Sequence, residues 1–351
     1  MPDTAARKRR QYGAYYTERS PFDLRPFQEW AELASLGDCT VLEPFAGSNN
    51  IVRMLQDAGL CTRFDCYDIA AGSGPADAEA APGAADGVRI TRRDTLRSFP
   101  AGYRACVTNP PWLARNSAHR RNLDFDVPDR HDDVYKYALE LALENCDYVA
   151  FIIPATFLRS GLFRSRLESF VLLEKRPLFA DTDNPVCLAL FAPSASAAVR
   201  RARVWADDVF LGYLDELERR YDIRTRTPSR MRIRFNSPGG MLGLWGVDNT
   251  REESIRFCHG SEMSHRTVKQ TDRSITRIDP AGARVTPHMI DGLNALLGEF
   301  RRETRDVFLA PFKGLRSDGR YRRRLDYAAA RGLISRYLHR RRNGRGSLSG
   351  R

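Results

Sequence analysis

Hydrophobic residues form two kinds of pattern over the first 195 residues, and the two alternate along the chain. Short apolar runs are typical of buried strands, and apolar residues three or four positions apart are typical of helices. Phe27, Trp30 and Leu33 have the helical spacing, and Gly37 is the predicted end of that helix. We predict strands over 39–45, 61–69, 88–96, 105–111, 147–158, 167–178 and 184–193, and helices over 21–37, 51–60 and 132–145. The alternation predicts an α/β fold with a doubly wound, mostly parallel sheet of seven strands.

The pattern weakens towards the C-terminus. The segment PSASAAVRRAR (193–203) is typical of a linker, so we predict one domain over residues 1–195 and a smaller one over residues 204–351. In the second domain, helices are predicted over 206–221 and 291–303, and a turn with a strand within 237–247. These elements do not define a fold for the second domain.

The composition is that of a globular protein, with 42% hydrophobic and 28% charged residues in a chain of 351. No apolar run approaches the roughly 20 residues of a membrane span, and no apolar segment of a secretion signal follows the basic N-terminus. Seven cysteines without a Cys-x-x-Cys pair indicate reduced thiols in a cytoplasmic protein. Cys258, His259 and His265 lack a fourth ligand, so no metal site is expected. The missing Gly-x-Ser-x-Gly motif gives hydrolase chemistry no support.

Basic residues concentrate near the C-terminus. Residues 301–351 contain sixteen Arg or Lys and four Asp or Glu, a balance of +12 that equals the net charge of the whole chain. Such a segment is attracted to the phosphates of a nucleic acid, and a solubilising tail is the alternative. The C-terminal arginines expected to bind nucleic acid are Arg322, Arg323, Arg324, Arg340, Arg341 and Arg342.

Acidic and small residues follow the predicted strands at the points where the strands end. The carboxyl ends of parallel strands meet at one edge of a doubly wound sheet, so Glu43, Asp68 and Asp94 are expected to lie close together. Gly47 lets a ligand approach the backbone, while Asp68 suits a ribose diol and Asp94 an adenine amino group. The turn lacks both Gly-x-Gly-x-x-Gly and a P-loop lysine, which favours an adenosine ligand without pyrophosphate. S-adenosylmethionine fits this description, and the alternative is that each acid caps a turn.

The fourth predicted strand ends in Asn109-Pro110-Pro111-Trp112. Two prolines fix the backbone, so the Asn109 side-chain oxygen and the Pro110 carbonyl are held in place. Two fixed acceptors can draw the hydrogens of an aromatic amino group out of its plane and localise the lone pair for attack on a methyl group. Trp112 offers a face on which an extruded base can stack. The alternative is an ordinary turn that ends a strand.

A polar segment, residues 113–133, follows this corner. It is predicted to be a mobile loop that closes over nucleic acid through Arg115, Arg120 and Arg121, and a solvated loop is the alternative. Tyr135 and Lys136 are expected to pack or to face solvent.

Six stretches together resemble the N6-adenine DNA methyltransferases of restriction–modification systems, in the gamma-type motif order. They are GAYYTE (13–18), LEPFAGS (42–48), YDI (67–69), RRDTL (92–96), TNPPW (108–112) and AFIIPATFL (150–158), and they cover roughly residues 10–195. The resemblance implies a Rossmann-like class I methyltransferase domain with S-adenosylmethionine as cofactor, followed by a C-terminal DNA-recognition domain with an Arg-rich tail. It also implies duplex DNA as substrate and a restriction endonuclease that acts on the same site as partner.

The resemblance assigns roles to individual residues. Tyr16 and Thr17 would lie against the cofactor, Glu43 and Gly47 would line its methionine end, Asp68 its ribose and Asp94 its adenine, and Asn109, Pro110 and Trp112 would hold the target amine. The chain departs from the family at Asn49, where a glycine is usual, at Glu18, where a proline is common, and at Trp112, where tyrosine is more frequent. A second base-stacking aromatic is absent from TDNPVCLAL (182–190).

Several alternatives remain open. The corner suits any aromatic exocyclic amine, so methylation of RNA adenine N6 or of cytosine N4 has the same chemistry. A protein-glutamine methyltransferase would use a similar corner, but a protein substrate would not need the basic C-terminal region. A non-catalytic DNA-binding protein with a vestigial cofactor pocket is the alternative from another class, and Asn49 is its best support.

Overall fold

The computed structural model describes residues 20–71, 88–174, 185–194, 201–221, 232–263, 274–280 and 282–346, with side chains up to residue 340. The chain forms two compact units, the first comprising Met1–Phe157 and Gly161–Phe210, and the second Leu158–Ser160 and Leu211–Arg351. The units therefore divide near residue 210, whereas the sequence pattern had placed a linker at 193–203.

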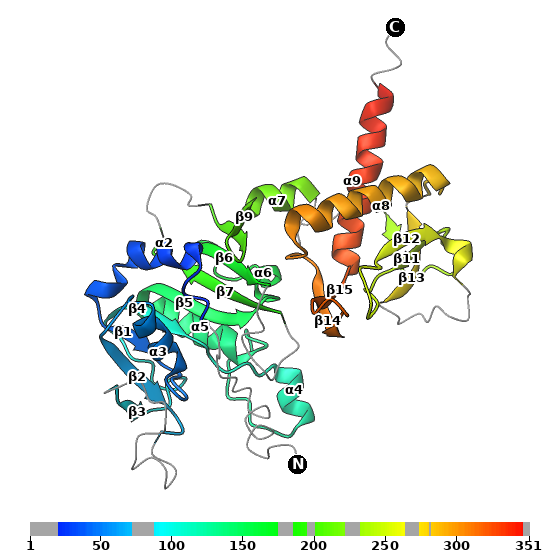
Figure 1. The fold of residues 1–351 in the computed structure, drawn as a ribbon. Helices are drawn as coiled ribbons and strands as arrows, with labels where there is room; N and C mark the ends of the chain where they lie inside the picture. The colour runs from blue at the N-terminus through cyan, green and yellow to red at the C-terminus, as the bar shows by residue number, and fades with distance from the viewer. Residues whose placement is uncertain are drawn as a thin grey trace. The chain divides into compact units, whose positions relative to one another are not determined.

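The first unit is built on one large sheet with the strand order β3-β2-β1-β4-β5-β7-β6-β8-β9 (Figure 1). Its strands are β1 (Val41–Glu43), β2 (Phe64–Asp68), β3 (Ile90–Arg92), β4 (Tyr103–Thr108), β5 (Cys146–Pro154), β6 (Leu167–Leu173), β7 (Val186–Phe191), β8 (Arg203–Ala206) and β9 (Val209–Tyr213). Neighbouring strands from β3 to β5 pair in parallel, and β8 pairs in parallel with β6, while β7 is antiparallel to both β5 and β6. The α/β class and the mostly parallel sheet are confirmed.

The sheet has nine strands rather than the predicted seven, because β8 and β9 extend it beyond β6. The predicted helix over 206–221 is wrong in its first half, since β9 takes up Val209–Tyr213 and the helix α7 begins at Leu214. Its apolar residues Val209 and Phe210 lie on an edge strand, where they are about 40% exposed.

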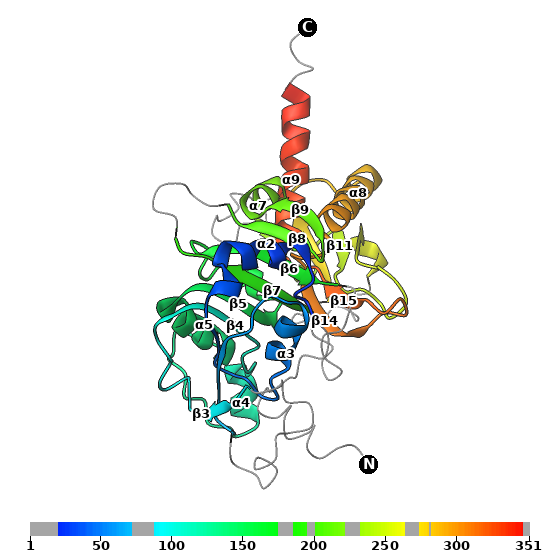
Figure 2. The same ribbon diagram turned by 60° about the vertical axis from the view of Figure 1, so that its left-hand side comes forward.

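Helices cover both faces of this sheet, and Figure 2 shows α3 and α5 on opposite sides of it. The helices of the first unit are α2 (Arg25–Ala34), α3 (Asn50–Asp57), α4 (Arg115–Arg120) and α5 (Val134–Asn145), with a 3₁₀ turn η1 (Leu36–Asp38), while α6 (Phe157–Ser160) belongs to the second unit except for its first residue. Helix α2 ends at Ala34, three residues before the predicted Gly37, because Ser35 takes the left-handed conformation that closes it. The buried Trp30 indole on α2 donates a hydrogen bond to the carbonyl of Phe191, 2.8 Å away, which fixes the helix on the sheet.

The centre of the sheet is apolar on both faces. Every residue of β6 and β7 is buried, as is β5 from Val149 to Ile153. Central strands that are covered by helices on both sides have continuous apolar runs rather than alternation. This is why the sequence showed these strands so clearly.

The second unit contains a four-stranded sheet of order β10-β13-β11-β12 and a separate hairpin, β14–β15. Its elements are α7 (Leu214–Tyr221), β10 (Ile233–Arg234), β11 (Leu242–Trp245), β12 (Arg256–His259), η3 (Gly260–Glu262), β13 (Ile275–Pro280), α8 (Pro287–Thr304), β14 (Ala310–Leu315), β15 (Tyr321–Arg324) and α9 (Tyr327–Gly346). The predicted strand within 237–247 and the helix over 291–303 are confirmed by β11 and α8. Helix α8 begins where its sequence favours it, with Thr286 accepting a hydrogen bond from the backbone N–H of Met289 and proline in the next position.

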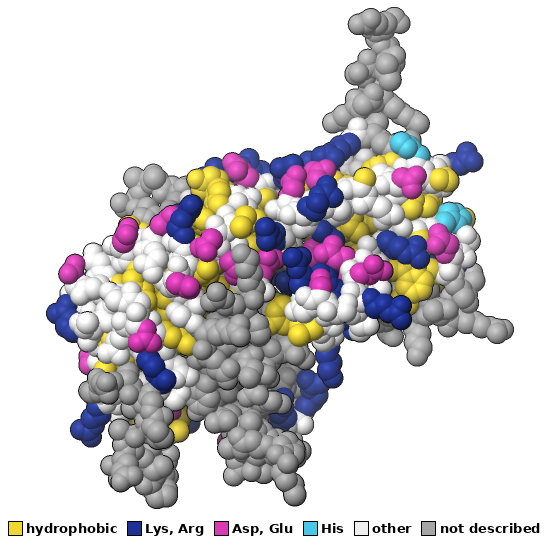
Figure 3. Space-filling model, viewed as in Figure 1, with side chains coloured by type: hydrophobic (Ala, Val, Ile, Leu, Met, Phe, Trp, Pro, Cys, Tyr) yellow, Lys and Arg dark blue, Asp and Glu magenta, His cyan; other side chains and the backbone are white. Residues whose placement is uncertain are grey.

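On the face drawn in Figure 3, Lys and Arg side chains lie among Asp and Glu side chains, and they do not form a patch of one sign. In the ranges that the structure describes, no helix is both long enough and apolar enough to cross a membrane.

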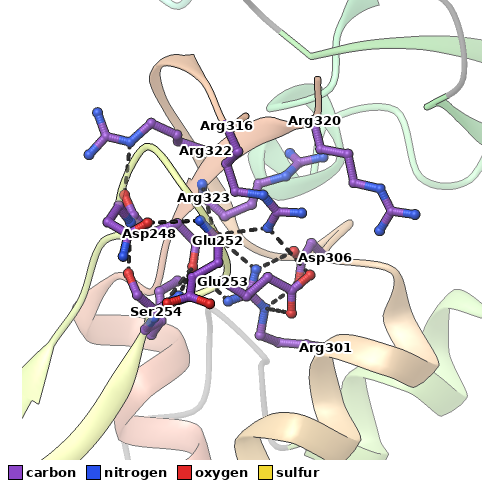
Figure 4. Close-up of polar contacts among 12 residues, drawn as sticks. Asp248, Glu252, Glu253, Ser254, Arg301, Asp306, Arg316, Arg320, Arg322 and Arg323 are labelled. Atoms are coloured by element: carbon purple, nitrogen blue, oxygen red, sulfur yellow. Dashed lines mark hydrogen bonds and ion pairs between the residues drawn. The ribbon is translucent and has the colours of Figure 1, made fainter. Parts of the chain in front are cut away.

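A buried ion cluster joins three elements of the second unit (Figure 4). Asp248, which follows β11 and is fully buried, receives two hydrogen bonds from the guanidinium of Arg301 on α8, at 2.8 and 2.9 Å. Arg301 also binds both carboxylate oxygens of Asp306, at 3.0 and 2.7 Å. Arg316, at the end of β14, lies 3.3 Å from Glu253 and 3.7 Å from Asp248. The cluster therefore ties the loop after β11, the end of α8 and the β14–β15 hairpin together.

Candidate active site

The candidate site lies at the carboxyl ends of β1 to β4. Strand β1 stands between β2 and β4, because the chain first builds the sheet outward to β2 and β3 and then returns to the other side of β1 as β4. Such a reversal in strand order opens a crevice at the carboxyl ends, which is where ligands bind in this type of sheet. Glu43 and Asp68 are the last residues of β1 and β2, Asp94 follows β3, and Asn109 follows β4. The four predicted strand-end residues therefore stand on adjacent strands at one edge.

Glu43 is the most buried acid of the site, with 1% of its surface exposed. Its Oε1 accepts hydrogen bonds from the Thr108 hydroxyl at 2.5 Å and from the backbone N–H of Phe45 at 3.0 Å. Burial raises the pKa of the Glu43 carboxyl to about 8, and the nearby charge of Asp68 adds to the increase, while the two hydrogen bonds oppose it. Among the described residues, its second oxygen, Oε2, has no hydrogen-bond partner.

The turn after β1 is held by hydrogen bonds to the end of β2 and to the loop after β3. The backbone N–H of Ala46 donates to the Tyr67 carbonyl, and that of Gly47 donates to Asp68 Oδ2, both at 2.9 Å. The Thr95 hydroxyl donates to the Pro44 carbonyl, also at 2.9 Å, inside the protein. The loops that follow β1, β2 and β3 are therefore hydrogen-bonded to one another.

Asp68 and Asp94 both accept hydrogen bonds from nearby backbone N–H groups. Asp68 receives Gly47 on one oxygen and Ala70 on the other, at 2.9 and 2.8 Å. Asp94 Oδ1 accepts from the N–H groups of Leu96 and Arg97, at 3.2 and 3.3 Å, and its Oδ2 lies 3.5 Å from the Arg97 guanidinium. Asp68 and Asp94 therefore do cap their own turns, as the alternative interpretation of the sequence predicts. It does not exclude ligand binding, because each carboxylate oxygen can accept more than one hydrogen bond.

The corner after β4 is largely enclosed. Asn109 is half-buried, and its side-chain oxygen is inaccessible to solvent. Pro110 is buried, and Trp112 is 8% exposed, so a base can reach the Trp112 ring only if the atoms that cover it move. The structure adds Thr108, which the sequence analysis missed because a β-branched residue in an apolar strand has the signal of an ordinary strand former.

The segment 113–133 is not the loose polar loop that we predicted. It contains α4, and its residues Leu113, Ala118 and Val127 form a hydrophobic cluster with Val134, the first residue of α5. The Arg115 guanidinium is bound inside this segment: Nη2 donates to the carbonyls of residues 127, 128 and 131, and Nη1 pairs with the carboxylate of residue 129 at 3.1 Å. These internal partners compete with the predicted contact of Arg115 with nucleic acid.

The remaining arginines that were predicted to bind nucleic acid differ in how exposed they are. Arg120 and Arg121 are exposed on or beside α4, and Arg340 is exposed on α9. Arg323 is 7% exposed, so little of its side chain is available to a phosphate in this conformation. Arg322 is half-buried and donates to the carbonyl of Asp248, and Arg324 is also half-buried. The structure does not describe the side chains of Arg341 and Arg342. Tyr16 and Thr17 lie wholly outside the described residues.

The residues present fit S-adenosylmethionine. Glu43 Oε2 and Asn49 Oδ1 are buried oxygens without hydrogen-bond partners among the described residues, and such acceptors normally have a ligand or water against them. Acceptors without a cluster of phosphate donors suit a cationic ligand that carries adenosine. The described residues contain no group of three or more His, Cys, Asp or Glu side chains that could hold a metal ion.

No protein-family model and no curated protein matches the chain. Among solved structures, it is similar to a type I restriction–modification methyltransferase subunit from Streptococcus thermophilus, with 13% identity, a TM-score of 0.37, and 54% of this chain and 47% of that chain covered. The type IIG restriction endonuclease BpuSI shares 15% identity, with a TM-score of 0.37 and coverage of 56% and 27%. The 23S rRNA methyltransferase ErmE shares 17%, with a TM-score of 0.30 and coverage of 49% and 70%. The chain thus spans less than half the length of the first two, and the likeness concerns the fold.

Proposed function

We propose that the chain is an S-adenosylmethionine-dependent methyltransferase that transfers a methyl group to N6 of adenine in duplex DNA. The observation that carries the proposal is the junction between β1 and β4. The buried Glu43 carboxyl binds the Thr108 hydroxyl at 2.5 Å, and Thr108 directly precedes Asn109. This junction fixes the acidic loop against the Asn-Pro-Pro-Trp corner, so a methyl donor on the loop and an amine at the corner would be neighbours.

The loop residues are proposed to hold the cofactor, which supplies an electrophilic methyl group on its sulfonium when bound. Glu43 and Gly47 would face the methionine end, Asp68 the ribose and Asp94 the adenine. Tyr16 and Thr17 are proposed to complete the site from the N-terminal segment. The backbone of Gly47, with φ of 53°, is already in the conformation that lets a ligand approach it closely.

The corner is proposed to activate the target amine without a titrating base. Asn109 Oδ1 and the Pro110 carbonyl would accept the two amino hydrogens and turn the nitrogen lone pair towards the methyl group. Extruding a base from a duplex costs a few kcal/mol, and stacking on Trp112 would offset about 1–3 kcal/mol of this cost. The segment 113–133 directly follows Trp112 in the chain, and we propose that this segment shifts so that the base can reach the Trp112 ring.

Basic side chains support a nucleic-acid substrate rather than a protein one. Arg120 and Arg121 on the first unit and Arg340 on the second are exposed, where they can meet phosphates. The second unit is proposed to read the DNA sequence. A restriction endonuclease with the same target is the partner that this role would imply, and the chain would be its modification enzyme.

The proposal is tested by methyl transfer from tritiated S-adenosylmethionine to unmethylated bacterial duplex DNA and, separately, to RNA, followed by nucleoside analysis. We expect the label in N6-methyladenine of the duplex. Asn109→Ala should keep cofactor binding and lose activity by roughly 10²–10³-fold or more, as expected when a fixed polar group that stabilises the transition state is removed. Asn116→Ala, an exposed asparagine on α4, is the matched control and should stay active.

Each other outcome has a defined meaning. Label in RNA adenine or in cytosine N4 would replace the substrate while keeping the chemistry. Full activity in Asn109→Ala would remove Asn109 from the mechanism. A protein that fails to bind S-adenosylmethionine in isothermal titration would be the non-catalytic alternative.

A further inference from the structure

Glu43 uses its two carboxylate oxygens differently. Oε1 is committed to the protein, because it accepts from both Thr108 and Phe45. Oε2 is buried and has no hydrogen-bond partner among the described residues. A buried ionised carboxylate with one unsolvated oxygen is costly, whereas a protonated carboxyl is neutral and avoids most of this cost.

Among the residues that the structure describes, the groups that face Glu43 do not include a cation. From β2 it is faced by the Asp68 carboxylate and the Cys66 thiol, and from β4 by the Cys106 thiol and the Thr108 hydroxyl. No ion pair between Glu43 and a basic side chain is present in the described ranges, although ion pairs are frequent elsewhere in the same unit. Burial and the charge of Asp68 act in the same direction, and they favour the neutral form of the carboxyl around pH 7.

We propose that Glu43 makes the site selective for the cationic cofactor over its neutral product: the carboxyl is protonated in the free protein and releases its proton to solvent when S-adenosylmethionine binds. This inference rests on the proposed function. The O–H bond of Glu43 breaks, the proton passes to water or buffer, and no covalent bond forms. The ligand supplies the positive charge that no described residue places beside Glu43.

The product should affect the protonation of Glu43 differently from the methyl donor. S-adenosylmethionine carries a sulfonium and is cationic overall near neutral pH, whereas S-adenosylhomocysteine has a neutral thioether. After methyl transfer, the ionised carboxylate would be buried beside Asp68 without the sulfonium, and it would take up a proton again. Binding of the product should therefore release fewer protons than binding of the methyl donor, and near pH 7 this favours exchange of product for fresh donor.

The test is isothermal titration of the whole protein with S-adenosylmethionine and with S-adenosylhomocysteine, between pH 6 and 9, in buffers of different ionisation enthalpy. If one proton is released, donor affinity rises up to about tenfold per pH unit below pH 8 and levels off above it. The buffer dependence of the heat should approach one proton released near pH 7 for the donor and clearly less for the product.

Two variants assign the proton to Glu43. Glu43→Gln keeps an oxygen that can accept from Thr108 and Phe45, but it cannot ionise. The affinity of this variant for S-adenosylmethionine should therefore lose the pH dependence caused by Glu43 and keep only the dependence caused by titration of the ligand's own amino group. Thr108→Val removes a hydrogen bond that favours the ionised carboxylate, so the midpoint of the affinity profile should move to higher pH.

Three results separate the two proposals. Failure of the wild-type protein to bind S-adenosylmethionine at any pH would overturn the proposed function. Binding with the same pH profile in wild type and Glu43→Gln, and without proton release, would overturn only the role of Glu43. If Glu43→Gln does not fold, an unchanged midpoint in Thr108→Val would likewise overturn the role of Glu43.

Discussion

At the scale of single residues, Asn49 explains how the turn after β1 tolerates the loss of a glycine. Its φ is 58°, in the left-handed region where glycine is favoured and asparagine is the best tolerated replacement. The side chain is 1% exposed, and its Nδ2 donates to the Val88 carbonyl at 3.1 Å. The departure from the family pattern therefore preserves the backbone of the turn and adds a link to the segment before β3. Asn49 is therefore weaker support for a vestigial cofactor pocket than the sequence alone suggested.

The left-handed backbone of residue 49 predicts different costs for two substitutions. Asn49→Gly keeps the left-handed backbone and loses one hydrogen bond, so it should cost about 1 kcal/mol of unfolding free energy. Asn49→Ala also forces an unsuitable side chain into that conformation and should cost about 1–2 kcal/mol more. Urea unfolding measures both, with the neighbouring helical Asn50→Ala as control. Equal losses in the Gly and Ala variants would show that the backbone conformation of residue 49 does not matter.

The sequence could predict which residues stand at the strand ends, but not what each one contacts. Glu43, Asp68 and Asn109 were identified because strand ends in a parallel sheet converge, and this depends only on element order. The bond from Thr108 to Glu43 joins residues 65 positions apart and depends on the register between β1 and β4, which has no local signal. The turn cap made by Asp94 and its ion pair with Arg97 are local instead, and capping of a turn by each acid was the alternative that the sequence left open.

At the scale of elements, the segment 113–133 shows how an apolar cluster can escape pattern analysis. The members of its core, Leu113, Ala118, Val127 and Val134, are spaced five, nine and seven residues apart, which matches neither a helix nor a strand. Arg115 also holds the segment together, because its guanidinium reaches three carbonyls and lies 4.7 Å from the centre of the Phe125 ring. A charged residue counted as a DNA contact thus serves as the internal support of the fold next to Trp112.

Removing that support should loosen the segment. Arg115→Ala leaves several carbonyls without their donor and should cost about 2–3 kcal/mol, with faster limited proteolysis between residues 121 and 131. The Arg120 side chain is exposed, and the described residues that it bonds lie within its own helix, so Arg120→Ala should change stability by less than about 0.5 kcal/mol. Thermal unfolding and the mapping of cleavage sites compare the two. If Arg115→Ala is as resistant to protease as Arg120→Ala, the segment is held by its apolar cluster alone.

The ion cluster of the second unit makes that unit sensitive to acid. Burial acts to raise the pKa of Asp248, but the Arg301 guanidinium and the N–H groups of Ser254 and Ile255 outweigh it, so the pKa is lowered. A lowered pKa means that Asp248 stabilises the fold at neutral pH, and this contribution is lost as the pH falls below about 4. Burial raises the pKa of Asp306, so this neighbouring carboxyl contributes with the opposite sign.

Asp248→Asn should therefore destabilise the second unit by about 3–5 kcal/mol at pH 7, because it leaves the buried Arg301 charge without its main partner. The loss should be smaller at pH 3 than at pH 7, because the stability that the Asp248 carboxylate contributes declines once the pH falls below about 4. Hydrogen exchange of residues 248–254 and 310–324 at both pH values reports on this unit directly. Asp318→Asn is the control: its carboxylate is 46% exposed and screened by solvent, so its loss should have little effect. Equal exchange in both variants would show that the cluster does not stabilise the unit.

At the scale of the whole molecule, the net charge overstates the number of basic side chains that are available to bind nucleic acid. Arg301, Arg316 and Arg323 are each at most 7% exposed, and the first two have carboxylate partners inside the second unit. By contrast, Arg320 and Arg340 are exposed, and Figure 4 shows the Arg320 side chain pointing away from the ion cluster. The sequence predicts the charge of this region correctly, but only the structure separates the arginines that build the unit from those that face solvent.

This separation predicts how binding to duplex DNA should respond to salt. Each lysine or arginine that neutralises a phosphate contributes about −0.9 to the slope of log K against log salt concentration. If Arg320 and Arg340 contact phosphates, changing either one to Ala should make the slope shallower by about one without destabilising the fold. Arg323→Ala should leave the slope unchanged and lower the unfolding temperature, because its side chain is buried. Fluorescence anisotropy of a labelled duplex between about 50 and 200 mM salt gives the slopes. A shallower slope in Arg323→Ala, with Arg320→Ala and Arg340→Ala unchanged, would mean that the DNA-bound unit exposes a different set of arginines from the conformation described here.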